Sequence, residues 1–234
     1  MPAEIYNVFY AADELSELLC KQIRNNFFLS EEDIVDVSCA VKLALLRTKK
    51  CFIENNNKYY WSDSGEVVFN PFHSGQYSIF LYFASQEAVR CNNRSLADRI
   101  YYLNKMLNGC DIYYEVMLPD VFFLEHPVAS VMGRASYGNY FVFQQGCTVG
   151  GNHGSYPRFG EFVWLFANAT VIGNTSIGSN VFVSAGAFVK DEVVPDNTIV
   201  FGQSPNLILK TKPSEYFYKS SPFKAHNEIL ARQS

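Results

Sequence analysis

The chain has 234 residues, of which 48% are hydrophobic and 18% are charged, and its formal net charge is -4. A chain of this length and apolar content can bury a full core, as one large domain or as two small ones. Its Lys and Arg residues are dispersed and form no basic stripe, so we expect no nucleic-acid partner. No uncharged apolar run approaches the roughly 20 residues that span a bilayer. Acidic residues interrupt the first twenty positions, which argues against a signal peptide, and we expect a cytoplasmic protein.

The six cysteines are scattered along the chain, with neither a CxxC pair nor a matching His cluster. This spacing is typical of neither a zinc site nor a small disulfide scaffold. We therefore expect no bound metal, and we expect reduced thiols, as is usual in a cytoplasm. The cysteines are Cys20, Cys39, Cys51, Cys91, Cys110 and Cys147.

Residues 1–110 are predicted to form a mostly helical N-terminal domain. Apolar residues recur there at helical spacing, as in the stretch 15–23. Two turn-forming clusters, at 55–57 and 63–65, lie among β-prone residues. They predict a small β-hairpin near 51–70.

Residues 111–212 carry a six-residue repeat, with a branched apolar residue in first position and a small residue in fifth position. Such a repeat is typical of a triangular coil of three short strands, whose first-position side chains point inward. Stacked coils bury a continuous apolar column that a single coil could not bury. The clearest hexads begin at Val171, Ile177, Val183 and Val189, with others at Phe159, Leu165, Leu118, Leu124 and Phe143.

The predicted fold class is α+β: a mostly helical N-terminal domain followed by a left-handed parallel β-helix of hexapeptide repeats. Residues 213–234 follow as a C-terminal tail that is polar and aromatic by turns. The sequence assigns no function to this tail. A β-helix can also serve as a non-catalytic scaffold, so the fold alone does not establish an enzyme.

Three short motifs stand at the start of the repeat region: Asp111-Ile112, Leu124-Glu125-His126, and Gln145 shortly before Thr148-Val149-Gly150-Gly151. Together they resemble the serine acetyltransferase branch of the hexapeptide-repeat acyltransferases. That branch has an Asp-Ile step, a Leu-Asp-His segment and a Gln before Thr-Leu-Gly-Gly. The resemblance covers about residues 72–212, and it implies an acetyltransferase with acetyl-CoA as co-substrate.

The resemblance implies that His126 is the general base and that Asp111 orients it. A hydroxyl group is a poor nucleophile at neutral pH, and His has an unperturbed pKa suited to removing its proton. A carboxylate at the other ring nitrogen would fix the tautomer and stabilise the imidazolium. The competing explanations are that His126 fills a coil corner and that Asp111 is a turn residue at the domain junction.

The resemblance also places acetyl-CoA in a groove between neighbouring β-helices, where small residues let the pantetheine arm approach the backbone. Lysines near this groove are candidates for binding the CoA phosphates. The competing explanation is that the small residues belong only to the repeat and the lysines only to a solvated face. The implied cofactor-binding residues are Gly150, Gly151, Ala167, Ala185, Lys190 and Lys210, with Lys212 as a further candidate.

The loop after Gly151 departs from the family pattern. Serine acetyltransferases carry a longer glycine-rich loop ending in Arg-His-Pro-Lys, and here Ser155 and Tyr156 stand where that Arg and His belong. The family's acid for the substrate amine has no counterpart here. The charged groups that would recognise a zwitterionic amino acid are therefore missing. The residues expected to bind the acceptor are Glu125, His153, Tyr156, Arg158 and His73.

We therefore expect an O-acetyltransferase that transfers acetyl from acetyl-CoA to a carbohydrate hydroxyl, on a surface polysaccharide or its precursor. Serine O-acetylation and N-acetylation of an amino sugar are alternatives, because the same base and groove would serve them. The contrasting class is a non-catalytic β-helix scaffold. The resemblance further implies a homotrimer, with a dimer of trimers as the larger alternative.

Overall fold

The computed structural model describes residues 6–233. They form two compact units, one running to Ile53 and from Asn57 to Glu115, the other comprising Glu54–Asn56 and the chain from Val116. Among these described residues, no helix combines the length and the apolar character needed to cross a membrane.

The first unit is a helical bundle built around α3. Helix α3 is buried along almost its whole length, from Gly75 to Ala88, and both α2 and α4 pack against it. A helix that is covered on all sides in this way forms the centre of a core. The elements of this unit are β1 (Tyr6–Val8), α1 (Ala12–Asn26), α2 (Glu31–Ile53), the 3₁₀ helix η1 (Lys58–Tyr60), β2 (Val67–Phe69), α3 (Ser74–Arg90), α4 (Arg94–Asn108) and β3 (Asp111–Ile112).

The segment 51–70 differs from the hairpin that the sequence predicted. Helix α2 continues to Ile53, because Cys51 and Phe52 lie on its buried side. Only a single antiparallel bridge, Trp61 to Val67, forms locally. Strand β2 pairs instead in parallel with β1. The turn residues are present, but the partner strand lies near the N-terminus, where a local pattern does not reveal it.

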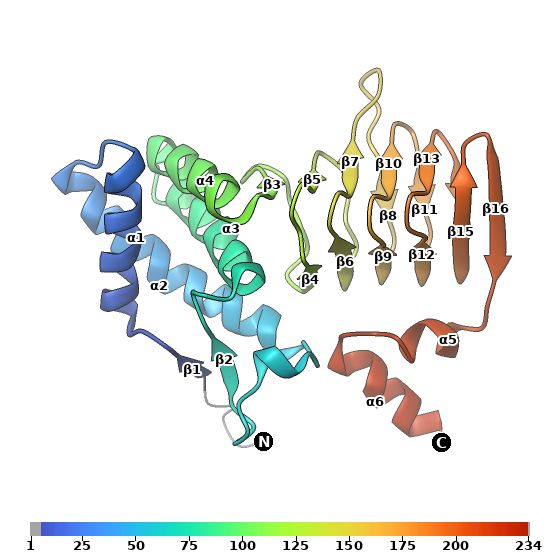
Figure 1. Ribbon diagram of the computed structural model, residues 1–234, viewed down its shortest axis with the longest axis horizontal. Coiled ribbons are helices and arrows are strands. Elements are labelled where there is room, and N and C mark those ends of the chain that lie inside the picture. The colour runs from blue at the N-terminus through green and yellow to red at the C-terminus, as the bar shows by residue number, and fades with distance from the viewer. Residues whose placement is uncertain (1–5, 234) are drawn as a thin grey trace. The chain divides into compact units, whose positions relative to one another are not determined.

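The second unit is a parallel β-solenoid with three faces (Figure 1). One face has the strand order β4-β6-β9-β12-β15, the second β5-β7-β10-β13 and the third β8-β11-β14, and β16 pairs antiparallel with β15. This confirms the predicted β-helix. Its elements are β4 (Phe122–Glu125), β5 (Val131–Met132), β6 (Phe141–Gln144), β7 (Thr148–Gly150), β8 (Arg158–Phe159), β9 (Val163–Leu165), β10 (Thr170–Ile172), β11 (Ser176–Ile177), β12 (Val181–Val183), β13 (Phe188–Lys190), β14 (Val193–Val194), β15 (Thr198–Gln203), β16 (Asn206–Thr211), α5 (Ser214–Tyr218) and α6 (Lys224–Gln233).

The hexad positions face the interior as the repeat predicted. All nine first-position residues named above are buried, and so are the fifth-position residues Thr175, Val181 and Ala187. Val193 is the exception at 76% exposed. It pairs with Ser176 and not with the buried Thr175, so the repeat slips by one residue there, and Val193 faces outward while Val194 is buried. At the corners the chain turns through the left-handed region, as at Asn168 with φ 62°, which Asn tolerates better than most residues.

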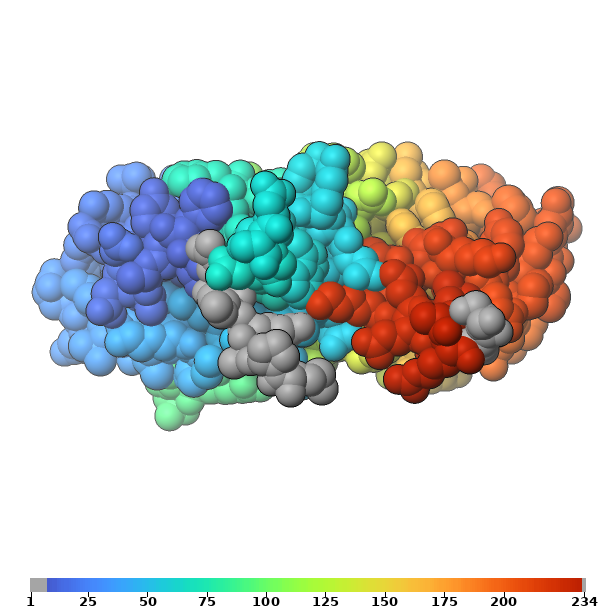
Figure 2. Space-filling model, turned by 90° about the horizontal axis from the view of Figure 1, so that it is seen from below, coloured from blue at the N-terminus to red at the C-terminus, as the bar shows by residue number. Residues whose placement is uncertain are grey.

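The C-terminal tail forms two helices that lie over one face of the second unit (Figure 2). Phe217 and Phe223 of the tail are fully buried. The His226 ring packs against the rings of Tyr140 and Phe162, at centroid distances of 4.9 and 4.3 Å. The tail is therefore part of the core of this unit.

Candidate functional site

One corner of the solenoid carries the predicted base and two of the predicted cofactor residues. The pairing of β4 with β6 ends at Glu125 and Gln144, and His126 follows Glu125 directly. The amide of Gly146 donates to the carbonyl of Val128 over 2.9 Å, so Val128 is level with Gln145 and His126 lies just before the corner. The amide of Asn168 donates to the carbonyl of Gln145 over 2.8 Å, and the amide of Gly186 donates to that of Ala167 over 2.9 Å, which stacks the following coils. His126 is exposed, with φ 50°. The residues at or beside this corner, which we call the His126 corner, are His126, Gln145, Ala167 and Ala185.

A second side chain fixes the carboxylate of Glu125 beside this corner. The Nε2 group of Gln144 donates to Oε2 of Glu125. Its Oε1 accepts a hydrogen bond of 3.0 Å from the amide of Ala167. The side-chain amide of Gln144 thus links three successive coils and orients the carboxylate of Glu125. Sequence reasoning missed Gln144, although Glu125 and Gln144 share the second position of their hexads and therefore stack.

Asp111 lies in β3 of the first unit, whereas His126 belongs to the second. Its Oδ1 accepts a hydrogen bond of 2.7 Å from the Tyr101 hydroxyl, and its Oδ2 accepts one of 2.6 Å from Lys105. Burial, followed by the bond to Asp111, raises the pKa of Tyr101. Both carboxylate oxygens have partners within the first unit. The pairing of Asp111 with His126 stays a prediction.

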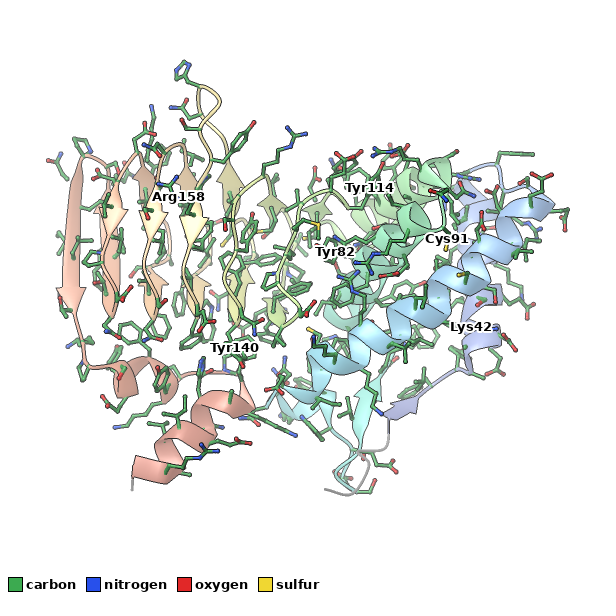
Figure 3. The ribbon with its side chains drawn as sticks, turned by 180° about the vertical axis from the view of Figure 1, so that it is seen from behind. Lys42, Tyr82, Cys91, Tyr114, Tyr140 and Arg158 are labelled. Carbon is green, nitrogen blue, oxygen red and sulfur yellow. The ribbon has the colours of Figure 1, made fainter. Side chains whose placement is uncertain are left out.

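The loop between β7 and β8 projects beyond the strand ends (Figure 1). Two backbone hydrogen bonds of 2.9 and 3.0 Å between Asn152 and Ser155 close a tight turn, with His153 exposed at its tip. The ring of Tyr156 lies against Gly151, where an added Cβ would meet it at 2.6 Å. Arg158 is exposed at the base of the loop (Figure 3). Three of the residues predicted to bind the acceptor therefore lie on or beside one exposed loop.

His73 has a structural role in the first unit. It is the N-cap of α3, where its Nδ1 accepts a hydrogen bond of 3.3 Å from the amide of Gln76. Its ring lies 6.0 Å from the rings of both Tyr59 and Tyr60. These contacts account for a histidine at this position, and its predicted contact with the acceptor stays a prediction.

The predicted cofactor residues do not gather in one patch. Ile172 of β10 pairs with both Gly150 and Lys190, so these two lie in one row at one edge of the second face. The corner with Ala167 and Ala185 bounds the other edge, about 10 Å away across strands of three residues. Lys210 lies on β16, with its Nζ 5.2 Å from the centre of the Phe201 ring.

Gly150 differs from the other glycines near the site because the fold does not require it. A Cβ added there would meet nothing within 4 Å, and its φ is outside the left-handed region. At Gly151, by contrast, the ring of Tyr156 leaves no room. A glycine that neither sterics nor backbone conformation demands is compatible with a ligand that approaches the backbone closely.

An apolar pocket of about 250 Å³ opens beside Ala185. Its volume lies just below the range of roughly 300 to 1,000 Å³ typical of small-molecule sites. Of its lining, sequence reasoning identified only Ala185. One lining residue, Tyr216, comes from the tail. The lining residues are Phe166, Phe182, Ser184, Ala185, Ile199, Phe201 and Tyr216. Within residues 6–233, no three His, Cys, Asp or Glu side chains are grouped so as to hold a metal ion.

Comparison with known proteins connects this fold to one group of enzymes. No family model matches the chain. The serine acetyltransferase of Synechococcus elongatus is 34% identical over 104 residues, which cover 42% of this chain and 43% of that protein. The crystal structure of Neisseria gonorrhoeae serine acetyltransferase matches with a TM-score of 0.65 at 21% identity, covering 88% of this chain and 83% of that one. The chain is similar to the serine acetyltransferases in sequence and in fold.

A second serine acetyltransferase structure, from Brucella abortus in complex with coenzyme A, matches with a TM-score of 0.60 at 15% identity, covering 87% of this chain and 83% of that one. At such identities the structural similarity to serine acetyltransferases establishes the fold alone. The chain spans less than half the length of the first curated serine acetyltransferases that it matches.

Proposed function

We propose that the chain is an acetyl-CoA-dependent O-acetyltransferase whose acceptor is serine. The observation that carries this proposal is the His126 corner, where an exposed histidine follows Glu125 directly, next to the stacked coils of Ala167 and Ala185, in a chain similar to serine acetyltransferases. The carbohydrate acceptor expected from the sequence has no support among the comparisons, which favour serine.

In the proposed reaction the serine hydroxyl attacks the thioester carbonyl of acetyl-CoA, while His126 removes the hydroxyl proton. The C–S bond then breaks, and the imidazolium returns the proton to the departing thiolate of CoA. A positioned base of this kind contributes about 10² to 10⁴ in rate. Asp111 would hold the other ring nitrogen and stabilise the imidazolium.

Acetyl-CoA would lie along the second face, with its pantetheine arm against the backbone of Gly150 and Gly151 and of the corner at Ala167 and Ala185. The structure of a serine acetyltransferase in complex with coenzyme A supports this choice of co-substrate. Lys190 and Lys210 are the proposed partners of the phosphates. We also propose that the chain assembles as a homotrimer, which sedimentation equilibrium would test.

The acceptor site would use the charges of two segments. Serine carries both a carboxylate and an ammonium group. A site that binds both needs a cationic group for the first and an anionic group for the second. Arg158 supplies an exposed guanidinium at the base of the loop, and Glu125 supplies a carboxylate that Gln144 holds in place. His153 at the loop tip could approach the acceptor if the loop closes.

A carbohydrate acceptor is the second candidate, and one observation favours it. Ser155 and Tyr156 stand where the family has its Arg and His, so the guanidinium expected on the loop itself is missing. The exposed ring of Tyr156 would suit packing against a sugar.

The test is the release of free CoA thiol from acetyl-CoA by the purified protein, with serine, amino sugars, sugars and nucleotide sugars as separate acceptors. Serine-dependent release supports the proposal, with O-acetylserine identified by mass spectrometry. Release with a sugar alone would show that the acceptor is a carbohydrate and not serine. Acetylation of an amino sugar on nitrogen, or no release with any acceptor, would contradict the proposal.

A further inference from the structure

Two cysteines from different helices of the first unit bring their sulfur atoms together. Cys39 lies in α2. Cys91, which is labelled in Figure 3, is the C-cap of α3. Their Sγ atoms are 3.3 Å apart, although 52 positions separate the two residues in the chain. Cys39 is exposed and Cys91 is partly exposed, whereas the other four cysteines are buried.

Polar contacts on both sides hold these sulfurs in place. One turn before Cys39, Asp36 accepts a hydrogen bond of 2.8 Å from the side chain of Asn93, two residues after Cys91. On the other side, Arg47 of α2 donates to Glu87 of α3 at 2.9 Å. The thiol pair thus lies between two cross-links from α2, one to α3 and the other to Asn93 at the start of α4. A disulfide needs such close, fixed cysteines, because its geometry is narrow.

The two thiols differ in their surroundings. Burial, followed by the contact with Cys39 and the nearby charges of Asp36 and Glu87, raises the pKa of Cys91 to about 11. The Cys91 thiol donates to the Cys39 sulfur, so Cys91 keeps its proton while Cys39 is the exposed acceptor. The thiolate is the attacking species, and because Cys39 is the more exposed of the two thiols, we expect it to react first with a reagent from solution.

We propose that Cys39 and Cys91 form a reversible disulfide that links α2 to the end of α3. The oxidant is a small disulfide of the glutathione class. In the first step, the Cys39 thiolate attacks one sulfur of oxidised glutathione, the S–S bond of the reagent breaks, and one glutathione thiolate leaves. In the second step, Cys91 loses its proton to solvent and attacks the Cys39 sulfur, which releases the second glutathione thiolate. Two protein thiols are oxidised, and one small disulfide is reduced to two thiols.

The disulfide is independent of the proposed acetyltransferase activity. Cytosolic disulfides are typically transient and redox-sensing, and an exposed pair of this kind can be reduced again by glutathione. Closing a long loop also restricts the unfolded chain, so the oxidised protein should be harder to unfold.

The experiment treats the full-length protein with oxidised glutathione at pH 8 and follows it by intact mass and by peptide mapping without reductant. The expected result is a loss of about 2 Da, the mass of two hydrogens, with the peptides of Cys39 and Cys91 joined, and a melting temperature several degrees higher. Reduction with dithiothreitol should reverse all three changes.

Variants separate the two steps. In Cys91→Ser the reaction should stop after the first step, with a stable glutathione adduct on Cys39. In Cys39→Ser neither adduct nor disulfide should form on the same timescale, while Cys147→Ser should behave as the native chain. Six free thiols after treatment, or a lasting glutathione adduct on the native protein with Cys91 still titratable, would overturn the proposal.

Discussion

A column of glycines at one corner of the solenoid gives the sharpest test of the coil packing. Gly138, Gly160 and Gly178 occupy this corner in successive coils, and an added Cβ on each would collide with backbone atoms of the next coil. For Gly160→Ala, the new Cβ would lie 2.7 Å from the carbonyl carbon of Gly178 and from the amide nitrogen of Ser179. We predict that this variant is clearly less stable than the native chain.

The magnitude follows from the geometry. Ordinary contact begins at 3.4 Å, so the two coils must separate by about 0.7 Å, and backbone cannot swing aside as a flexible side chain does. The hydrogen bond of 2.8 Å from the amide of Gly160 to the carbonyl of Ile177 lies at the same place and must lengthen. Overpacking of this kind costs about 1 to 3 kcal/mol.

The assay is urea unfolding followed by far-ultraviolet circular dichroism, supported by a thermal melt. At about 2 to 4 °C per kcal/mol for a chain of this size, the melting temperature of Gly160→Ala should fall by a few degrees or more. Gly150→Ala is the matched control, because its Cβ meets nothing. Equal melting of Gly160→Ala and the native chain, or an equal loss in the control, would refute the packing argument.

Three further predictions concern the site and the tail. Gly150→Ala should raise the KM for acetyl-CoA severalfold while stability stays unchanged, and an unaltered KM would remove Gly150 from the cofactor groove. Gln144→Leu should release the carboxylate of Glu125 and raise the KM for serine more than it lowers kcat; steady-state kinetics would show a pure kcat effect if this view of Glu125 is wrong. Burial lowers the pKa of His226 from 6.5 to about 4, so between these values the unfolded chain binds a proton that the folded chain does not. Stability should therefore be complete above pH 6.5 and decline towards pH 4, by up to about 1.4 kcal/mol per pH unit, and the slope of the urea midpoint against pH should flatten in His226→Phe.

The solenoid could be predicted from the sequence because its information is periodic and local. Each coil needs an inward-facing apolar side chain at the same positions. Residues such as Val171 and Val183 therefore identify the fold without knowledge of which residues lie beside them in space. The same local periodicity indicated that the N-terminal half is helical. It did not reveal that β2 pairs with β1, because nothing in segment 51–70 specifies a partner near the N-terminus.

The candidate site could be predicted only in part, for a related reason. His126, Ala167 and Ala185 follow from the repeat and the family motifs; the structure stacks Ala167 and Ala185 in successive coils and places His126 directly after Glu125 at the end of β4. The bond from Gln144 to Glu125 becomes visible only when hexads of neighbouring coils are superposed. The pocket beside Ala185 depends on Tyr216 of the tail, whose position no repeat encodes. The approach of Cys39 to Cys91 likewise depends on how two helices pack.

The most direct test of the central claim is the rate of serine-dependent CoA release by His126→Ala, measured beside His153→Ala after both variants are shown to melt with the native protein. We predict that His126→Ala loses about 10² to 10⁴ in kcat, whereas His153→Ala, whose side chain lies at the exposed loop tip, loses far less. Native turnover in His126→Ala would show that the His126 corner is not the catalytic centre.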